Sequence, residues 1–386
     1  MRYLQAIHRL KQLSWRRLFR VCNHRKSARL NLFRLKKKFT VSMKKSDKKF
    51  KKVVISGYYG FDNFGDETIL SVLVKKIKEF TPFITVLSKN PSKTRDLYKV
   101  ESTLYCCPCI ALFRVLQADI LISGGGSLLQ DVTSIKSLLY YLFVINMSLF
   151  FRKTVIIFAQ GIGPINNPIG RWLTKNTLKK CKLVTVRDEK SLFLMRGWGI
   201  KADLVCDPLF DLEMFDYEPS GRVGVQLRGF KTLKDNLLQK LAEHVNKEFA
   251  DKQIEIYSFQ DGLDYEVCRS FEVMLRAVNP IIQTKIIYNQ TSQQILFNMS
   301  KLDYLVAMRF HANLIALKYG IKTLAVCYDE KVEKLATEAQ IPYVSMLADE
   351  DYDEKFSQLK NLDRQQLLDF ANSKHFDWTK IEELMK

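Results

Sequence analysis

Long apolar segments are scarce in this chain of 386 residues, although its overall composition is that of a globular protein. The longest apolar run, residues 138–151, has 14 residues, which is short of the roughly 20 that a spanning helix needs. No uninterrupted apolar segment follows the basic N-terminus, so the pattern of a secretory signal is missing too. We therefore expect a buried helix at 138–151 and a cytoplasmic protein.

Paired metal ligands are also lacking. The chain has eight cysteines and five histidines. Cys106, Cys107 and Cys109 lie close together, but no second paired set follows to complete a zinc site. The other cysteines stand mostly singly among apolar residues, which indicates reduced thiols. Since the sequence also has no nucleophile elbow, Walker loop or histidine cluster, we expect neither a metal nor a cofactor.

Acidic residues are almost absent from the first 52 positions. This segment holds nineteen Lys or Arg and one acid, Asp47, and so accounts for +18 of the formal net charge of +20. The remaining residues carry about +2. Because the positive charge belongs to one segment, the folded part needs no polyanionic partner, and we do not expect it to bind nucleic acid.

Residues 1–42 combine this charge with apolar residues at roughly helical spacing and with the aromatic side chains of Trp15 and Phe19. A basic amphipathic helix with aromatics is typical of a segment that lies on an anionic membrane surface. Nucleic-acid binding, a dispensable solvated extension and a true translation start at Met43 are alternatives that the residues leave open.

The rest of the chain alternates between strand-like and helical segments. Strand-like stretches recur at 51–56, 83–88, 118–126, 154–164, 181–191 and 202–208, and again at 222–229, 253–260, 284–289, 301–312 and 321–329. This alternation predicts an α/β, GT-B-like fold, with two Rossmann-like domains whose parallel sheets face a central cleft. The expected parts are a basic leader at 1–50, an N-terminal domain at 51–217, a C-terminal domain at 218–328 and a helical segment at 329–386.

Glycine-rich turns follow several of these strands, at the sheet end where ligands bind in such folds. In the turn at 57–67 the dinucleotide-binding spacing is absent, and Asp66 and Glu67 would repel a bound anion. Together with Asn63, these side chains suit the hydroxyl groups of a sugar. The simpler alternative is that Asp66 caps the helix that follows.

A second turn begins at Gly124 and offers the backbone amides of Gly125 and Gly126 to the same sheet end. Asp131 follows about one turn later. This carboxylate is a candidate base for activating a hydroxyl group, or else a solvated acid near a helix start.

Basic residues follow two strands of the second half. Arg309 and His311 come after the strand-like run at 301–312, and Arg228 ends the strand at 222–229. An arginine fork fits a carboxylate or a phosphate, and a histidine can donate a proton near neutral pH. Parallel packing predicts that these residues meet at one edge, although a surface Arg228 and a structural His311 are the plain alternatives.

Seven motifs in chain order resemble the polysaccharide pyruvyl transferase family, in particular the type that modifies secondary cell-wall polymers. They are ISGYYGFDNFGDE, ILISGGGSLLQD, AQGIGPI, VTVRDEKS, GVQLR, MRFHA and CYDEKV. The resemblance covers about residues 53–345. Gln226 stands where the family often has Ser, and Phe310 replaces a more usual Leu. The leader has no counterpart in this pattern.

The resemblance implies transfer of a pyruvyl group from phosphoenolpyruvate to a sugar, usually as a 4,6-ketal. The acceptor is often N-acetylmannosamine in a lipid-linked precursor or polysaccharide of the cell envelope, made at the inner face of the membrane. By position, the donor would be held by Arg228, Arg309 and His311. The acceptor would meet Asn63, Asp66, Glu67 and Asp131.

The chemistry of this donor agrees with these residue types. Its carboxylate and phosphate call for two cations, C3 must gain a proton, for which His311 is the candidate acid, and a sugar hydroxyl must lose one, for which Asp131 is the candidate base. Two other readings remain open, namely a GT-B glycosyltransferase that uses a nucleotide sugar and a non-catalytic protein that binds membrane or nucleic acid through residues 1–52.

Overall fold

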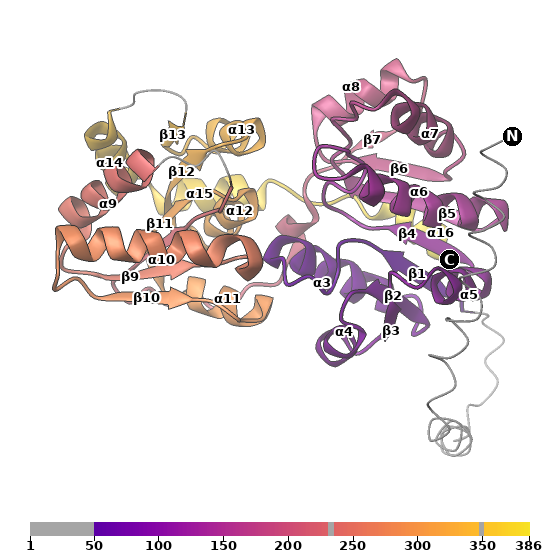
Figure 1. Ribbon diagram of the computed structural model, residues 1–386, viewed down its shortest axis with the longest axis horizontal. Helices are drawn as coiled ribbons and strands as arrows, with labels where there is room; N and C mark the ends of the chain where they lie inside the picture. The colour runs from indigo at the N-terminus through magenta and orange to yellow at the C-terminus, as the bar shows by residue number, and fades with distance from the viewer. Residues whose placement is uncertain (1–49, 231–234, 347–350) are drawn as a thin grey trace, which may run out of the picture. The chain divides into compact units, whose positions relative to one another are not determined.

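Two parallel β-sheets, formed by consecutive parts of the chain, organise this computed structural model (Figure 1). The structure describes residues 50–230, 235–346 and 351–386. The amphipathic segment expected at 1–42 lies outside these ranges. Phe50–Lys386 make up one unit by their contacts.

The first sheet has seven parallel strands in the order β3-β2-β1-β4-β5-β6-β7. The strands are β1 (Val53–Ser56), β2 (Ile84–Ser88), β3 (Glu101–Leu104), β4 (Ile120–Ser123), β5 (Thr154–Gln160), β6 (Leu183–Val186) and β7 (Asp203–Leu204). The helices are α3 (Phe64–Lys78), α4 (Pro91–Tyr98), α5 (Pro108–Gln117), α6 (Ile135–Phe150), α7 (Pro168–Leu178), α8 (Glu189–Gly197) and the 3-10 turn η1 (Pro208–Asp211). The central strands are continuous apolar runs because helices cover both faces of a parallel sheet.

The second sheet has six parallel strands in the order β10-β9-β8-β11-β12-β13, which repeats the order of the first. The strands are β8 (Arg222–Gln226), β9 (Gln253–Tyr257), β10 (Thr284–Ile287), β11 (Leu302–Ala307), β12 (Lys322–Cys327) and β13 (Tyr343–Ser345). The helices are α9 (Asp235–Phe249), α10 (Asp261–Val278), α11 (Ser292–Met299), α12 (Phe310–Tyr319), α13 (Glu330–Glu338), α14 (Tyr352–Asn361), α15 (Arg364–Asn372) and α16 (Thr379–Met385).

The predicted α/β architecture with two parallel sheets is confirmed. One detail differs, because β13 lies in the segment at 329–386 that was expected to be helical. Its three residues pair with β12, and so short a strand carries no periodic pattern of its own. The strand-like run at 301–312 is also split, since β11 ends at Ala307 and α12 starts at Phe310.

Each face of the first sheet has its own apolar layer. Val54, Leu121 and Val155 point to one face, where they join buried residues of α5, α6 and α7 in one cluster. Neighbouring strand residues such as Ile55 point to the other face and pack with α3. The helix expected at 138–151 is α6. Among the described residues, no helix combines the length and apolar character needed to cross a membrane.

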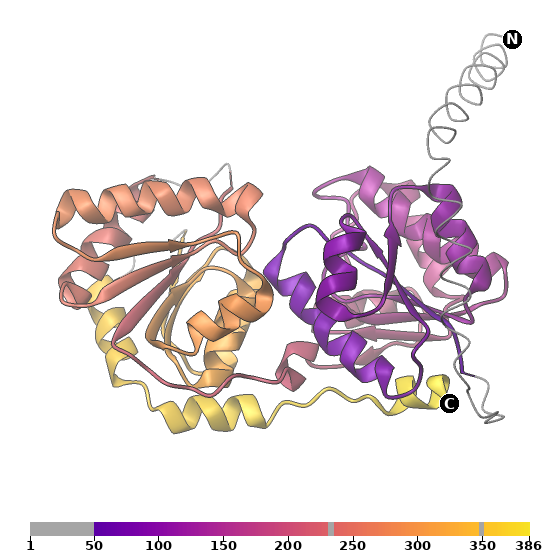
Figure 2. The same ribbon diagram turned by 90° about the horizontal axis from the view of Figure 1, so that it is seen from below.

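The C-terminal segment connects the two sheets a second time (Figure 2). α15 packs on α12 of the second half, and the chain then returns to the first half. There the Trp378 indole N–H donates to the Asp211 carboxylate over 2.7 Å, and the rings of Phe376 and Phe158 lie 5.0 Å apart. The tail therefore packs back on the first sheet.

The strand order reverses direction at one point in each sheet. β1 and β4 are neighbours in the first sheet, and β8 and β11 are neighbours in the second. Loops that leave the carboxyl ends of such strand pairs diverge and open a crevice, which is where doubly wound sheets bind ligands. The sequence-predicted site residues follow these four strands.

Candidate functional site

Two helix N-termini meet at the carboxyl ends of the switch strands. α3 follows β1, and α12 follows β11. They approach so closely that a Cβ on Gly65 would lie 1.9 Å from Nδ1 of His311. Only glycine permits this approach, so position 65 helps to set the place of the His311 ring in the first turn of α12.

His311 lies in a buried charged cluster. Its Nε2 is 3.4 Å from Nη1 of Arg187 and 3.6 Å from Oδ2 of Asp207. Arg187 also donates to Asp207 over 2.7 Å, with the two side chains 10% and 2% exposed. Arg187 and Asp207 follow β6 and β7, whereas His311 belongs to the second sheet. The cluster therefore ties the two halves of the chain together.

The cluster sets the protonation of its members. Burial alone would raise the pKa of Asp207, but the hydrogen bond from His311 and the charge of Arg187 outweigh it and hold that pKa below its usual range. Burial lowers the pKa of His311, and the nearby Asp207 carboxylate only partly opposes this. The unliganded site therefore favours an ionised Asp207 and a neutral His311 near neutral pH.

Ser127 and Lys331 extend the cluster toward open space. The Lys331 ammonium donates to Oγ of Ser127 over 3.2 Å, and Nη2 of Arg187 lies 3.5 Å from the same oxygen. Burial, followed by the charge of Arg187, lowers the pKa of Lys331. A Cβ on Gly161 would lie within 3.2 Å of both Ser127 Oγ and Lys331 Nζ. Two basic groups, a hydroxyl and a carboxylate oxygen of Asp188, 3.1 Å from the same Cβ position, thus converge where glycine leaves room.

Asp66 lies in the first turn of α3 and faces Gly126 instead of capping its helix. Asn63 is the cap, since its side chain accepts from the Gly65 amide over 3.1 Å. Gly126 has a φ of +100°, and a Cβ there would lie 2.6 Å from Oδ1 of Asp66. Burial raises the pKa of Asp66 to about 7, although the charge of Arg187 opposes it. A carboxyl group with this pKa can both accept and donate a proton near neutral pH.

The other acceptor-side residues have structural partners. Glu67 is buried and accepts from the Gly60 amide over 2.6 Å and from the Tyr98 hydroxyl over 2.7 Å. Glu67 therefore holds the turn before α3. Gly125 packs against Ile69, to which an added Cβ would come within 2.9 Å.

Asp131 has a different place from that expected of a base. Its two carboxylate oxygens accept from the backbone amides of Asn166 and Asn167 over 2.9 and 2.7 Å. These bonds lower its pKa. Asp131 therefore ties the loop after β4 to the loop after β5, and no contact of the described residues joins it to His311.

The two arginines expected to bind the donor also have protein partners. Arg309 makes a two-pronged pair with the buried Asp264, with Nε to Oδ2 at 2.8 Å and Nη2 to Oδ1 at 2.7 Å. Its backbone amide donates to Oε1 of Gln226 over 2.8 Å. Arg228 donates to the Tyr328 hydroxyl over 2.6 Å, while its Nε is buried without a hydrogen-bond partner.

Of the residues that the structure brings together here, sequence reasoning named His311 and Asp66 but not Arg187, Ser127, Lys331, Asp207 and Asp264. A signal existed for the first three, because they lie within or beside the family motifs VTVRDEKS, ILISGGGSLLQD and CYDEKV. Asp207 follows β7 and Asp264 lies in α10, and the sequence around neither residue indicates a functional role. Their partners come from distant parts of the chain.

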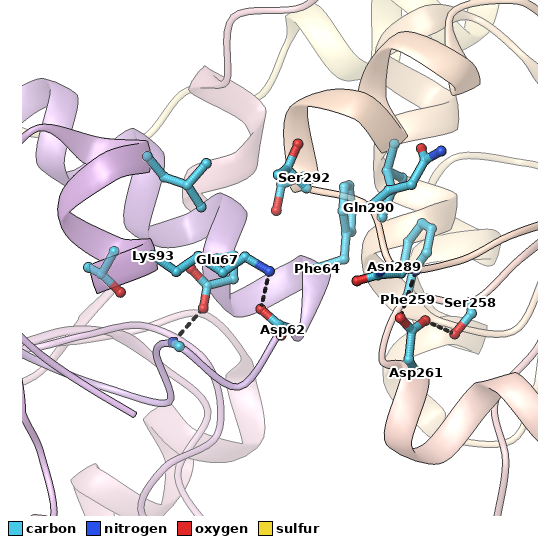
Figure 3. Close-up of a pocket in the computed structure, with 15 residues that line it drawn as sticks. Asp62, Phe64, Glu67, Lys93, Ser258, Phe259, Asp261, Asn289, Gln290 and Ser292 are labelled. Atoms are coloured by element: carbon cyan, nitrogen blue, oxygen red, sulfur yellow. Dashed lines mark hydrogen bonds and ion pairs between the residues drawn. The ribbon is translucent and has the colours of Figure 1, made fainter. Parts of the chain in front are cut away.

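A polar pocket lies beside the start of α3 (Figure 3). It has a cavity volume of only about 30 Å³ and is lined from both halves of the chain. Asp62 pairs with Lys93 over 2.8 Å, and Asp261 accepts from the Ser258 hydroxyl over 2.6 Å. Asp62 is therefore paired with a cation, whereas Asp261 is hydrogen-bonded by a neutral donor, and the pocket also presents hydroxyl and amide groups with the Phe64 ring between them.

Solved structures of sugar-nucleotide enzymes resemble the chain. HepE of Anabaena in complex with UDP-glucose has a TM-score of 0.60 at 11% identity, covering 87% of this chain and 98% of its own. UDP-GlcNAc 2-epimerase of Neisseria meningitidis bound to UDP-GlcNAc has a TM-score of 0.58 at 11% identity, covering 86% and 99%. MnaA of S. aureus with UDP has a TM-score of 0.57 at 9% identity, and the match covers 86% of this chain and 94% of its own. At these identities the likeness shows a shared GT-B-like fold.

No protein with a curated function matches the sequence. The family model described as polysaccharide pyruvyl transferase does match, over residues 63–330. This range is more than half of the chain and includes Asp66, Arg187, Asp207 and His311. The protein therefore belongs to the polysaccharide pyruvyl transferase family.

Proposed function

We propose that the protein transfers the pyruvyl group of phosphoenolpyruvate to a sugar of a cell-envelope polysaccharide or of its lipid-linked precursor. The observation that carries this proposal is the convergence of Arg187 and Lys331 on Ser127, with His311 3.4 Å from Arg187 and with a nearby carboxyl group, Asp66, whose pKa is about 7. This arrangement offers one region for an anionic donor and a proton acceptor for a neutral sugar.

The donor fits the basic region by charge and by shape. Phosphoenolpyruvate carries a carboxylate and a phosphate, which suit the planar fork of Arg187 and the point charge of Lys331. α8 and α12 begin at Glu189 and Phe310, next to Arg187 and His311. Their N-terminal amides add partial positive charge. Asp207 keeps Arg187 and His311 in place.

The proposed reaction needs one acid and one base. His311, protonated when the anionic donor is bound, gives its proton to C3 as the double bond opens and C2 becomes electrophilic. A sugar hydroxyl attacks C2 and passes its proton to Asp66. The C2–O bond to phosphate then breaks, a second hydroxyl closes the ketal, and its proton leaves with inorganic phosphate. Asp66 then releases its proton to solvent and His311 takes one up, which regenerates both residues, so that in the net balance the two hydroxyl protons are accounted for by C3 and by phosphate.

Asp66 replaces Asp131 as the proposed base for two reasons. Both oxygens of Asp131 are already bonded to backbone amides, which lowers its pKa. Asp66 has a raised pKa and lies within electrostatic range of Arg187. Arg228 and Arg309 are proposed as supports of the site, since among the described residues neither is hydrogen-bonded to Arg187, Ser127 or Lys331. The scheme uses no metal and no cofactor.

The acceptor side is proposed to include the polar pocket beside α3 (Figure 3). At about 30 Å³ the pocket has room for one hydroxyl group of a sugar, and its hydrogen-bonding side chains suit such a group better than an anion. Asn63, whose amide lies 3.3 Å from that of Gln260, lies between this pocket and Asp66. N-acetylmannosamine, modified as a 4,6-ketal, is the proposed sugar, and the cytoplasm at the inner membrane face is the proposed location.

A nucleotide-sugar transferase is the second candidate, because the similar solved structures hold UDP or UDP-sugars. A thermal-shift series with phosphoenolpyruvate, UDP-sugars and GDP-sugars separates the two. We expect stabilisation by phosphoenolpyruvate. Stabilisation by a sugar nucleotide alone would favour the second candidate.

The direct test follows both products. Purified full-length protein is incubated with phosphoenolpyruvate and a cell-wall glycan, and inorganic phosphate release and the mass of the glycan are measured together. We expect equimolar phosphate and a pyruvyl mass increment. No phosphate release, with consumption of a sugar nucleotide instead, would contradict the proposal.

A further inference from the structure

Three neighbouring helices form the outer layer on one face of the first sheet. α5 packs against α6, and α6 packs against α7. Their inward residues, among them Val115, Leu142 and Leu178, belong to one buried cluster with the sheet. Figure 1 shows α6 lying over β4 and β5. The opposite sides of these helices therefore face outward.

The outward side of α6 carries a continuous apolar stripe. Ile135, Leu139 and Phe143 are spaced by four residues, and Phe150 follows seven residues later, so all four lie on one side of the helix. They are 36%, 44%, 42% and 73% exposed. Large apolar side chains in such a row are unusual on a surface that faces only water.

The neighbouring helices extend this surface. On α5 the exposed residues are Ile110, Phe113 and Leu116, and on α7 they are Ile169 and Trp172, which are 67% and 63% exposed. With the stripe on α6, these residues form what we call the α5–α7 face.

Basic residues outnumber acidic ones around this face, although the Asp131 carboxylate lies at the start of α7, bonded to the amides of Asn166 and Asn167. No acidic residue occurs between Asp131 and Asp188, a stretch that includes α6 and α7 and contains nine Lys or Arg. α5 has no acidic residue either. Basic side chains therefore border the apolar ones, as Lys136 does on α6 and Arg171 does on α7.

We propose that the α5–α7 face rests on an anionic membrane surface. Apolar and aromatic side chains would enter the headgroup region, and the surrounding Lys and Arg would contact lipid phosphates. Nucleic acid would leave the aliphatic stripe unused. A second copy of the chain would bring two basic surfaces together, which is unfavourable.

A groove connects this face with the charged cluster. It has a volume of about 860 Å³ and is lined by Phe193 and Trp198 at α8, by four basic residues that include Arg171 and Lys331, and by four acidic residues, namely Asp188, Glu189, Asp329 and Glu330. Its other apolar walls are Ile162, Pro164 and Ile165. If the protein has the proposed function, a membrane-anchored acceptor would reach the charged cluster along this groove while its lipid stays in the membrane; this part of the inference rests on that function.

Every protein in the test is the full chain, so any binding of anionic lipid by residues 1–42 is the same in all of them and the variants differ only at the substituted positions. Vesicles of equal parts phosphatidylglycerol and phosphatidylcholine, and of phosphatidylcholine alone, are sedimented with wild type, with F143E/W172E and with V273E/I281E. The control pair makes the same charge change at residues that are 65% and 89% exposed on the second half. We expect the face variant to lose about tenfold or more in affinity for anionic vesicles. Equal binding by both variants would overturn the proposal.

Fluorescence locates the contact independently. Brominated phosphatidylglycerol should quench W15F, which lacks the indole of the basic leader, and the quenched component should disappear when W172F is added but remain when W378F is added instead. Quenching that W172F leaves unchanged, or light scattering that shows a face-dependent dimer with no lipid binding, would overturn the proposal. Pyruvyl transfer to a soluble glycan should be unaffected in F143E/W172E, so a failure of the proposed activity is seen separately.

Discussion

Oδ1 of Asp66 lies so close to Gly126 that a Cβ on this glycine would be 2.6 Å from the carboxylate oxygen. Asp66 comes from the first turn of α3, and Gly126 comes from the turn after β4. The two switch strands of the first sheet thus bring a carboxyl group against bare backbone. Asp66 can lie here because Gly126 has no side chain.

Replacement of Gly126 by Ala should displace Asp66 and reduce activity. The added methyl group meets the carboxylate, and the φ of +100° strains any other residue. We expect kcat to fall by about tenfold to a hundredfold, since misplacement of a reacting group by about 1 Å has effects of this size. Phosphate release measures it. Gly199→Ala is the matched control, because Gly199 has a φ of +69° but an added Cβ meets nothing within 4 Å. An equal loss in both variants would assign the effect to backbone strain.

Asp66 should make the protein less stable as pH rises. Its pKa is about 7 in the folded protein and 3.8 as the ordinary value, so between these values the folded state binds the extra proton. The contribution of Asp66 to the free energy of unfolding is fully present below about pH 4, and it is lost as the pH rises through about 7. D66N should therefore be more stable than wild type at pH 8 and gain less at pH 5. Urea unfolding at the two pH values gives the difference, and a gain that is constant with pH would contradict the raised pKa.

Kinetics should distinguish the two carboxylates considered as the base. If Asp66 accepts the hydroxyl proton, kcat/KM rises with pH along a limb with a pKa near 7, and D66N loses that limb. D131N should retain it, because Asp131 bonds to backbone amides. A pH profile that loses its limb in D131N but not in D66N would restore the assignment made from sequence.

The two sheets could be predicted because their central strands carry strong local signals. β5 and β11 are apolar runs bounded by turn residues, and the loop after β1 is rich in glycine. β13 could not be predicted, because a three-residue strand depends on its pairing with β12 instead of its own pattern. The boundary after Ala307 was blurred for a similar reason, since Met308–Arg309–Phe310 continue the apolar character into α12.

The places of the candidate residues could be predicted where strand topology alone determines them. His311 and Asp66 follow switch strands, and parallel topology brings such ends together. Sequence could not show that Arg309 is bound to Asp264 or that Asp131 is bound to two amides, because these contacts span 45 and about 35 residues. The family motif around Arg187 marked its segment, but the role of that side chain became visible only beside His311.

Lys331 should contribute directly to donor binding. A hydrogen bond that involves a charged group contributes about 1.5–3 kcal/mol, so K331A should raise KM for phosphoenolpyruvate by about 10- to 150-fold. Lys334 offers a control on the same helix, since its ammonium pairs with Glu189 over 2.9 Å and its side chain is 46% exposed. K334A should leave KM within about twofold. Equal increases in KM for the two substitutions would indicate that the positive charge of α13 as a whole attracts the donor, and that Lys331 makes no direct contact with it.

Removal of Arg187 should destabilise the fold through the charge that it leaves behind. Asp207 is 2% exposed, and breaking a buried pair by removing one partner costs about 3–5 kcal/mol. R276A is the matched control, because Arg276 pairs with Glu272 at the surface with side chains 55% and 24% exposed. In urea unfolding, R276A should lose no more than about 1 kcal/mol of unfolding free energy.

The double variant R187A/D207N then separates stability from activity. Neutralising Asp207 removes the uncompensated buried charge, so the double variant should recover much of the stability lost in R187A. Phosphate release should not recover, because Arg187 is proposed to bind the donor. Recovery of both properties would assign Arg187 a purely structural role. Recovery of neither would mean that Asp207 is stabilised in the folded protein by His311 more than by Arg187.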